Sequence, residues 1–285
     1  MKILLTGASG QVGYELERSL QGLGEVFAPD RARLDLADLD QVRDTVRELR
    51  PGLIVNAAAY TQVDKAEAEP ELALRINAQA PGVMALQARE VGAAMVHFST
   101  DYVFNGDKDG PYTESDPTGP LNVYGETKLL GEQAIASAGI SHLILRTSWV
   151  YGMRGHNFLR TVLRLAAERD ELRVVADQRG APTWSRSVAQ TTAHILAQAQ
   201  LGGPKWWRDN RGTYHLSCQG ETTWSGFAEA IVAATGSACR IVPITTDEYA
   251  APARRPRNSV LSSSKLMARF CRVPDWREAL RLCLQ

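Results

Sequence analysis

The chain has 285 residues, with 32 basic and 32 acidic side chains and a hydrophobic content of 44%. This composition is typical of a soluble globular protein, and the zero net charge gives no indication of a nucleic-acid or anionic-membrane partner. The N-terminal segment MKILLTGASG has too few large apolar residues for a signal peptide or a membrane span, so we expect a cytoplasmic protein. No Cys-x-x-Cys spacing occurs, and neither a zinc site nor a disulfide framework is expected from the four cysteines, Cys218, Cys239, Cys271 and Cys283.

Short apolar runs alternate with amphipathic segments through the first half of the chain. The expected strands are residues 2–6, 25–28, 53–58, 93–100 and 142–147. The expected helices between them are residues 10–20, 39–49, 70–91 and a segment around residue 124. Strands separated by 10 to 20 helical residues indicate right-handed βαβ crossovers and a parallel sheet. The pattern therefore predicts an α/β fold in which residues 1–150 form a doubly wound parallel-sheet Rossmann domain.

The alternation becomes less regular after residue 150. The expected elements are a helix at 156–169, a strand at 172–175, a loop at 177–184, a helix at 186–199, a polar Trp-containing segment at 202–212 and a strand at 213–217. We predict that residues 151–285 form mainly a smaller C-terminal α/β substrate-binding lobe. A segment near residues 183–217 is expected to return into the main sheet.

The motif TGASGQVG follows the first expected strand and opens the first helix. Glycines at such a turn let the backbone approach a pyrophosphate, with free N–H groups and the positive helix end facing the anion. The spacing is one residue longer than the usual dinucleotide fingerprint, and a generic glycine turn is the alternative. The cofactor-binding residues predicted from this motif are Gly7, Gly10, Gln11, Val12 and Gly13.

Charged residues follow the second expected strand. Asp30 stands where an acidic side chain accepts hydrogen bonds from an adenosine ribose. Arg31 and Arg33 beside it suit a ribose 2′-phosphate instead, so the choice between NADH and NADPH stays open. Asp35 and Leu36 are predicted to lie at the adenine end, with a solvated loop as the alternative.

A second set of residues points to proton transfer. Ser99, Thr100 and Asp101 end an apolar strand, at the edge of a parallel sheet where ligands bind. Tyr124 and Lys128 are four apart in a helical segment, so both side chains project from one face. An ammonium near a phenol favours the phenolate and lowers the phenol pKa toward neutrality. The pair is therefore either a proton donor with its electrostatic activator or an ordinary piece of helix surface.

Seven segments together resemble the extended short-chain dehydrogenase/reductases, with a match from residue 1 to about residue 262: TGASGQVG, NAAAYTQVDKAE, STDYVFNG, PLNVYGETKLLGE, RTSWVYG, DQRGAPT and RRPRNSVL. Within that family they are similar to the branch that reduces the C4 keto group of dTDP-4-dehydro-L-rhamnose with NADPH or NADH. The resemblance implies a role in supplying dTDP-L-rhamnose for surface polysaccharide.

The resemblance also assigns roles to individual residues. It implies that Thr100 and Tyr124 meet the charge growing on the substrate oxygen, that Tyr124 supplies the proton, and that Lys128 contacts the nicotinamide ribose. Tyr124 and Lys128 thus count as both catalytic and cofactor-binding. Further cofactor contacts are assigned to Ala57, Ala58 and Ala59.

The family pattern places a deoxyhexose pocket and a nucleotide site in the same cleft. Trp149 either presents a flat face to the sugar or is a buried core indole. Arginines such as Arg254 and Arg255 suit phosphate geometry, with solvated loop residues as the alternative. The substrate-binding residues implied are Thr61, Val63, Asp101, Tyr102, Trp149, Asn157, Arg255 and Asn258.

Two other functions are compatible with the sequence. Sugar-nucleotide dehydratases of this fold carry a Glu after the acid that follows the Thr, whereas Tyr102 follows Asp101 here, which argues against dehydration. An epimerase or a reductase of a related ketosugar uses the same Tyr and Lys and remains an alternative. A non-catalytic NADP-binding regulatory subunit is the alternative from another class, although an intact Tyr/Lys pair argues against it.

Some family members form a dimer bridged by a magnesium ion that glutamates hold. Glu15 keeps the first such position, but Arg186 falls at the second, and the chain stops at Gln285 where a third would follow. Hard divalent ions need several oxygen ligands, so we expect no metal and either a monomer or a homodimer formed in another way. His97, alone in a strand, is expected to be a core residue.

Overall fold

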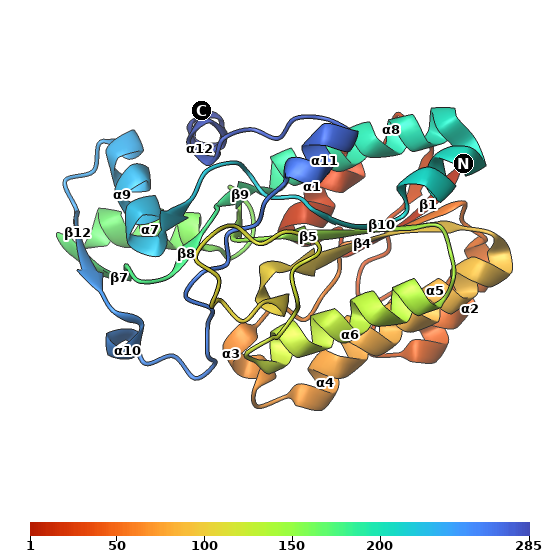
Figure 1. Cartoon of the computed structure of the whole chain (residues 1–285), viewed down its shortest axis with the longest axis horizontal. Coiled ribbons are helices and arrows are strands. Elements are labelled where there is room, and N and C mark those ends of the chain that lie inside the picture. Colours follow the sequence, from red (N-terminus) through yellow and green to blue (C-terminus); the bar gives the residue numbers. More distant parts are fainter.

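The computed structural model describes residues 1–285 and is built on one six-stranded parallel sheet (Figure 1). The strand order is β10-β5-β4-β3-β1-β2, so the chain winds outward in both directions from the β1/β3 pair. This confirms the predicted doubly wound α/β fold, in which ligands bind beyond the carboxyl ends of the strands near the switch point. The strands are β1 (Lys2–Thr6), β2 (Glu25–Phe27), β3 (Leu53–Asn56), β4 (Ala94–Thr100), β5 (His142–Thr147) and β10 (Gly212–His215).

Helices cover both faces of the sheet (Figure 1). Alternate residues of β1 belong to different cores: Ile3 and Leu5 pack in one cluster, and Leu4 packs in the other. The first cluster includes residues of α1 (Gln11–Ser19) and α8 (Ser185–Asn210). The second includes residues of α2 (Leu39–Leu49), α5 (Ala80–Val91) and α6 (Val123–Ser137). The central strands are buried on both sides and therefore consist of continuous apolar runs.

The long helix expected at residues 70–91 is interrupted by a π-helical turn. It consists of α4 (Pro70–Leu74), the π-turn η1 (Arg75–Gln79) and α5, preceded by the short α3 (Val63–Ala66). The side chain of Asn77 in this turn accepts a hydrogen bond from the Tyr60 N–H and donates to the Thr127 hydroxyl of α6. The π-turn thus ties the loop after β3 to the helix that carries Tyr124.

Helix α8 extends farther than expected, through the segment predicted to be polar and irregular. Gly203, with φ 58°, breaks the helical conformation just before Pro204, and the helix then resumes to Asn210. Trp206 and Trp207 in the resumed part pack against the first core cluster. Partial burial of these two indoles explains why a segment of polar composition continues as helix. The next strand, β10, pairs in parallel with β5 of the main sheet.

Residues from 151 onward build a further apolar core beside the main sheet (Figure 1). It includes side chains of α7 (Phe158–Glu168), β7 (Glu171–Val175), α9 (Trp224–Thr235) and α12 (Trp276–Cys283), and β7 pairs in parallel with β12 (Arg240–Ile244). Three of the cysteines, Cys218, Cys239 and Cys283, are buried in this core as free thiols. The remaining elements are η2 (Asp101–Val103), β6 (Val150–Tyr151), β8 (Arg179–Gly180), β9 (Thr183–Trp184), β11 (Thr222–Thr223), α10 (Thr246–Tyr249) and α11 (Ser264–Arg269).

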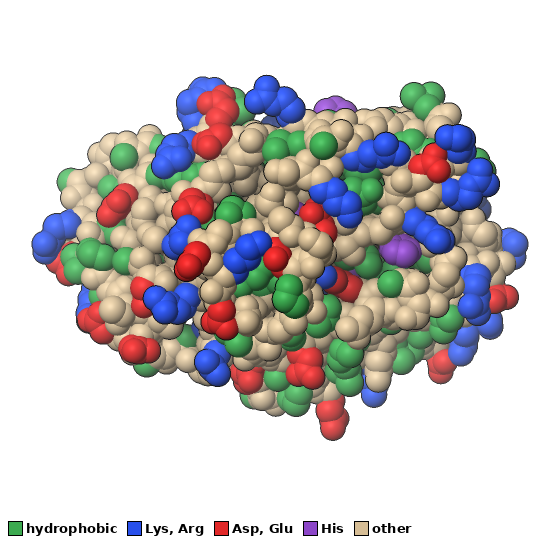
Figure 2. All heavy atoms as spheres, viewed as in Figure 1, with side chains coloured by type: hydrophobic (Ala, Val, Ile, Leu, Met, Phe, Trp, Pro, Cys, Tyr) green, Lys and Arg blue, Asp and Glu red, His purple; other side chains and the backbone are tan.

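The surface agrees with the balanced charge of the sequence. Acidic and basic side chains are interspersed over the face drawn in Figure 2. None of the helices combines the length and apolarity needed to cross a membrane.

Candidate active site

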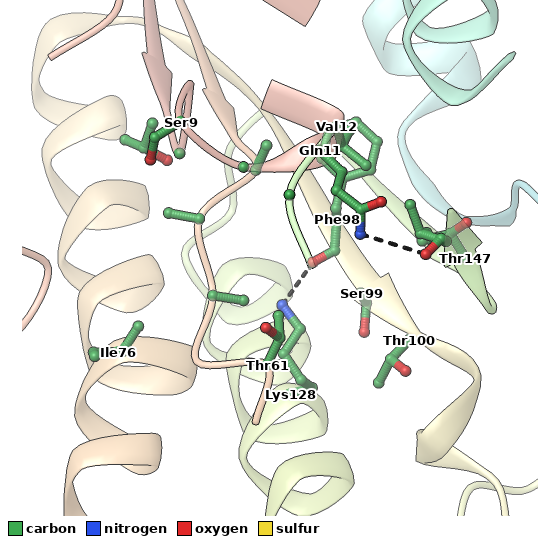
Figure 3. Close-up of a pocket in the computed structure, with 18 of the residues that line it drawn as sticks. Ser9, Gln11, Val12, Thr61, Ile76, Phe98, Ser99, Thr100, Lys128 and Thr147 are labelled. Carbon is green, nitrogen blue, oxygen red and sulfur yellow. Dashed lines mark hydrogen bonds between the residues drawn. The ribbon is translucent and has the colours of Figure 1, made fainter. Parts of the chain in front are cut away.

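A cavity of about 760 Å³ opens above the carboxyl ends of β1, β3, β4 and β5 (Figure 3). This volume is in the range of small-molecule and cofactor sites. The glycine turn lies at one side of the cavity, and Thr100, Tyr124 and Lys128 lie in the same space. Almost every residue that the sequence assigned to the cofactor lines it: Gly7, Gly10, Gln11, Val12, Asp30, Arg31, Asp35, Leu36, Ala57, Ala58, Ala59, Tyr124 and Lys128.

The glycine turn has no space for a side chain, because the backbone of the loop after β3 lies too close to it. Gly7 has φ +75°, and a Cβ there would lie 2.6 Å from the backbone nitrogen of Ala58 on the loop after β3. Gly10 precedes α1 in an extended conformation without a side-chain cap, so the first N–H groups of the helix have no side-chain partner there. An anion such as a pyrophosphate fits a helix N-terminus of this kind.

Gly13 differs from the prediction, because it is buried and does not line the cavity. A Cβ at this position would lie 2.5 Å from the carbonyl carbon of Gly7 and still closer to its oxygen. The third glycine of the motif therefore lets α1 pack closely against the turn.

Acidic and basic groups meet at the far end of the cavity. Arg31 forms an ion pair with Asp35 at 3.4 Å, and Asp30 accepts a hydrogen bond from the backbone N–H of Arg33. Arg31 lines the cavity, whereas the guanidinium of Arg33 stacks over the ring of Phe27 at 5.3 Å. An acidic residue, Asp30, and a basic residue, Arg31, therefore both line this end of the cavity.

Two N-terminal caps, on η2 and α6, and the close approach of these two elements bring Thr100 and Tyr124 together. The Thr100 hydroxyl accepts a hydrogen bond from the Tyr102 N–H at the start of η2, and the side chain of Asn122 caps α6 by accepting from the Gly125 N–H. Gly125 lets α6 approach η2, since a Cβ there would lie 3.0 Å from the carbonyl carbon of Tyr102 and closer to its oxygen. The rings of Tyr102 and Tyr124 consequently meet edge to face, with centroids 5.6 Å apart.

The expected effect of Lys128 on the phenol is not observed. Burial raises the pKa of Tyr124 to about 12, the Thr100 hydroxyl opposes this rise, and Asp101 adds to it. The Nζ of Lys128 turns toward β4, where it donates to the Phe98 carbonyl at 2.6 Å (Figure 3). Burial lowers the pKa of Lys128 itself to about 8.

Two buried polar groups at the end of β4 lack a partner. Neither the Ser99 hydroxyl nor Oδ2 of Asp101 has a hydrogen bond, while Oδ1 of Asp101 accepts from the Thr100 hydroxyl at 3.0 Å. Burial raises the pKa of Asp101 to about 6. Buried polar groups are normally satisfied, so the unpaired atoms beside the cavity are suited to a polar ligand.

A pair of stacked indoles forms the opposite wall. Trp149 adopts φ +46°, unusual for a bulky residue, and its ring stacks on Trp224 with centroids 3.5 Å apart. A Cβ at Gly180 would lie 2.6 Å or less from three atoms of the Trp149 ring, so the glycine makes room for the indole. Trp149 is therefore not a simple core residue, and one face of its ring is covered by Trp224. Trp224 also lines the cavity, and nothing in its local sequence distinguishes it from a core tryptophan.

The residues assigned to the substrate fall into two groups. Thr61, Val63, Asp101, Tyr102, Trp149 and Asn157 line the cavity. The amide of Asn157, however, is already engaged, because it donates to Gln11 at 2.8 Å and to the Gly152 carbonyl at 2.8 Å.

Two of the predicted substrate residues, Arg255 and Asn258, do not line the cavity. Arg255 pairs with Asp64 at 2.8 Å. Asn258 is buried and donates to the carbonyls of Lys108 and Gly110, which fixes that loop. Both polar side chains are used within the protein.

Arg186 stands at one of the magnesium positions of the family. The guanidinium of Arg186 lies over the ring of Trp184 at 5.7 Å. No group of three or more His, Cys, Asp and Glu side chains could hold a metal ion. His97 is fully buried, as expected, but it is hydrogen bonded on both ring nitrogens.

The doubly wound fold, the glycine turn and the Thr, Tyr and Lys side chains in one cavity define a nicotinamide-dependent enzyme of the short-chain dehydrogenase/reductase class. The family described as the RmlD substrate binding domain matches residues 1–285. A dTDP-4-dehydrorhamnose reductase of Burkholderia thailandensis is 51% identical, with 100% of this chain and 98% of the relative covered. The chain belongs to the dTDP-4-dehydrorhamnose reductase family.

Solved structures agree with this assignment. A dTDP-4-dehydrorhamnose reductase of Clostridium acetobutylicum superposes with a TM-score of 0.93 at 38% identity, covering 100% of this chain and 98% of the other. That of Bacillus anthracis, solved in complex with NADP, gives a TM-score of 0.91 at 37% identity, with 99% and 98% covered.

Proposed function

We propose that this protein reduces the C4 keto group of dTDP-4-dehydro-L-rhamnose with NADPH or NADH, giving dTDP-L-rhamnose for surface polysaccharide. Membership of the reductase family supports the substrate and the reaction. The observation that carries the proposal is the convergence of Thr100, Tyr124 and Lys128 in one cavity beside the glycine turn.

Different residues of this chain have different roles in the reduction. The nicotinamide cofactor, when bound, supplies a hydride for the C4 carbon. Tyr124 holds the proton that the C4 oxygen takes up, and its raised pKa keeps that proton in place at neutral pH until charge develops. General acid catalysis of this kind contributes about 100- to 10,000-fold.

Thr100 and Lys128 have supporting roles in this proposal. The Thr100 hydroxyl, which donates to Asp101 in this structure, turns to donate to the substrate oxygen. Lys128 contacts the ribose of the bound dinucleotide. Asp101, with one unpaired carboxyl oxygen, receives a sugar hydroxyl.

We further propose that different parts of the chain supply the two ends of the cavity. Residues 1–150 supply the glycine turn and the Asp30/Arg31 end, which take the dinucleotide. Residues 151–285 contribute Asn157 and Trp224, which support an assignment mainly to the substrate side.

The direct test supplies the purified protein with the ketosugar nucleotide and either NADPH or NADH. We expect one cofactor oxidised for each dTDP-L-rhamnose formed, followed by nicotinamide absorbance and mass spectrometry of the sugar nucleotide. Isomerised ketosugar without net cofactor oxidation would instead identify an epimerase. Cofactor binding without turnover of any ketosugar nucleotide would identify a regulatory subunit.

A further inference from the structure

A row of buried hydrogen bonds crosses the main sheet and ends at Lys128. Thr6, Asn56 and His97 are register partners on β1, β3 and β4, so their side chains point to the same face of the sheet. The Thr6 hydroxyl donates to Asn56 Oδ1 at 2.6 Å, and Asn56 Nδ2 lies 3.0 Å from His97 Nδ1. His97 Nε2 lies 3.1 Å from Lys128 Nζ. All four side chains are at most 3% exposed.

The direction of these hydrogen bonds can be fixed from one end. The backbone N–H of Ala58 can only donate, and it donates to Asn56 Oδ1 at 3.2 Å. The amide group of Asn56 therefore faces His97, whose Nδ1 must accept. A neutral imidazole that accepts at Nδ1 carries its proton on Nε2. The Nε2–H of His97 consequently points at the nitrogen of Lys128.

An ammonium has only hydrogen-bond donors. An N–H of a charged Lys128 would therefore face the Nε2–H of His97, with no acceptor between them. The amine form has a lone pair that accepts from His97 while one of its N–H groups donates to the Phe98 carbonyl. We propose that His97, oriented by Asn56, is a positioning residue that favours the amine form of Lys128 and so lowers its proton affinity in the ligand-free protein. The inference rests on the proposed function only in the role it gives to Lys128.

The surroundings of Lys128 act on its proton affinity in both directions. Burial lowers the pKa of Lys128 to about 8, and burial together with the nearby charge of Lys128 lowers the pKa of His97, which keeps the imidazole neutral. Glu132, one turn along α6, raises the pKa of Lys128. That carboxylate is itself held by a buried bidentate pair with Arg146 of β5, at 2.8 and 2.6 Å.

A lowered proton affinity of Lys128 has a consequence for the site. An ammonium beside a phenol lowers the phenol pKa, so a smaller ammonium fraction helps Tyr124 to keep its proton. A reductase needs that proton present before hydride transfer begins, because the substrate oxygen must take it up. The hydrogen-bonded row therefore favours the state of the ligand-free site that reduction requires.

The test titrates the Nζ of Lys128 by NMR in the ligand-free protein labelled with ¹⁵N-lysine, with the signal assigned by its loss in Lys128→Met. We expect a midpoint at or below about 8 in the wild type. In His97→Gln the amide can turn its oxygen toward Lys128 and favour the ammonium, so the midpoint should rise by about one pH unit, a tenfold gain in proton affinity. His142→Gln is the matched control, since His142 is a buried histidine of β5 that bonds Ile140, and it should leave the midpoint unchanged. A wild-type midpoint near the ordinary lysine value of about 10.4, or no change in His97→Gln, would overturn the proposal.

A second measurement needs no variant, in case His97→Gln fails to fold. Long-range ¹H–¹⁵N correlation in the wild type should show His97 as the Nε2–H tautomer. The Nδ1–H tautomer would overturn the proposal, because Nε2 would then accept from an ammonium. Both readouts use the protein without ligand, so they fail or succeed independently of any turnover of ketosugar.

Discussion

Replacing Gly13 with Ala tests whether close packing of α1 on the glycine turn shapes the cofactor site. The added Cβ would lie 2.5 Å from the carbonyl carbon of Gly7 and 2.9 Å from Cα of Ala8. Both atoms are backbone, so no flexible side chain can move away and the turn itself must shift. Overpacking costs about 1–3 kcal/mol, and we expect the upper end here. At about 2–4 °C per kcal/mol for a large domain, Tm should fall by about 6–12 °C.

The same shift should weaken NADPH binding, although Gly13 lines no part of the cavity. Losing one or two charge-assisted hydrogen bonds from the displaced amides corresponds to a Kd increase of about 10- to 100-fold. Calorimetric titration of NADPH measures this, with Gly22→Ala as the matched control because a Cβ at Gly22 meets nothing within 4 Å. If Gly13→Ala binds NADPH as tightly as Gly22→Ala does, the packing role assigned to this glycine is refuted.

Three further substitutions probe other parts of the site. Burial raises the pKa of Asp101 from 3.8 to about 6, so the folded chain binds this proton more tightly than the unfolded chain does. The carboxyl therefore costs increasing stability as pH rises from about 4 to 6, up to about 3 kcal/mol above that window. Urea unfolding should show Asp101→Asn gaining stability over the wild type across this window, and a difference independent of pH would contradict the assignment. Asn258→Ala should lower the free energy of unfolding by about 3 kcal/mol through three lost hydrogen bonds while leaving KM for the ketosugar unchanged; a raised KM would instead support a substrate contact at Asn258. Trp224→Ala should raise that KM about 2- to 12-fold by removing the stacked support of Trp149, with the NADPH Kd unchanged, and an unaltered KM would remove Trp224 from the substrate site.

The sequence was informative wherever function depends on local pattern. Alternating apolar and amphipathic segments predicted the parallel sheet, and the order of strand, glycine turn and helix predicted the side of the cavity where Gly7 and Gly10 lie. Residues at the end of β4 and in the first turns of α6 also fell into the same cavity, because both positions follow directly from the βαβ topology.

The sequence failed where a side chain is engaged by a partner far along the chain. Trp224 reaches the cavity by stacking on Trp149, and Asn258 is removed from it by carbonyls of a loop near residue 110. Lys128 has the predicted place, but a strand carbonyl and a histidine determine where its nitrogen points. Such contacts depend on tertiary packing that no local periodicity encodes.

The most direct measurement compares ketosugar reduction by the wild type and by Tyr124→Phe, with NADPH binding measured on both proteins. Phe keeps the ring packed against Tyr102 and removes only the hydroxyl that carries the proton. We expect turnover to fall by at least about 100-fold with the Kd for NADPH unchanged. Near-normal turnover in Tyr124→Phe would contradict the assignment of this phenol as the proton donor.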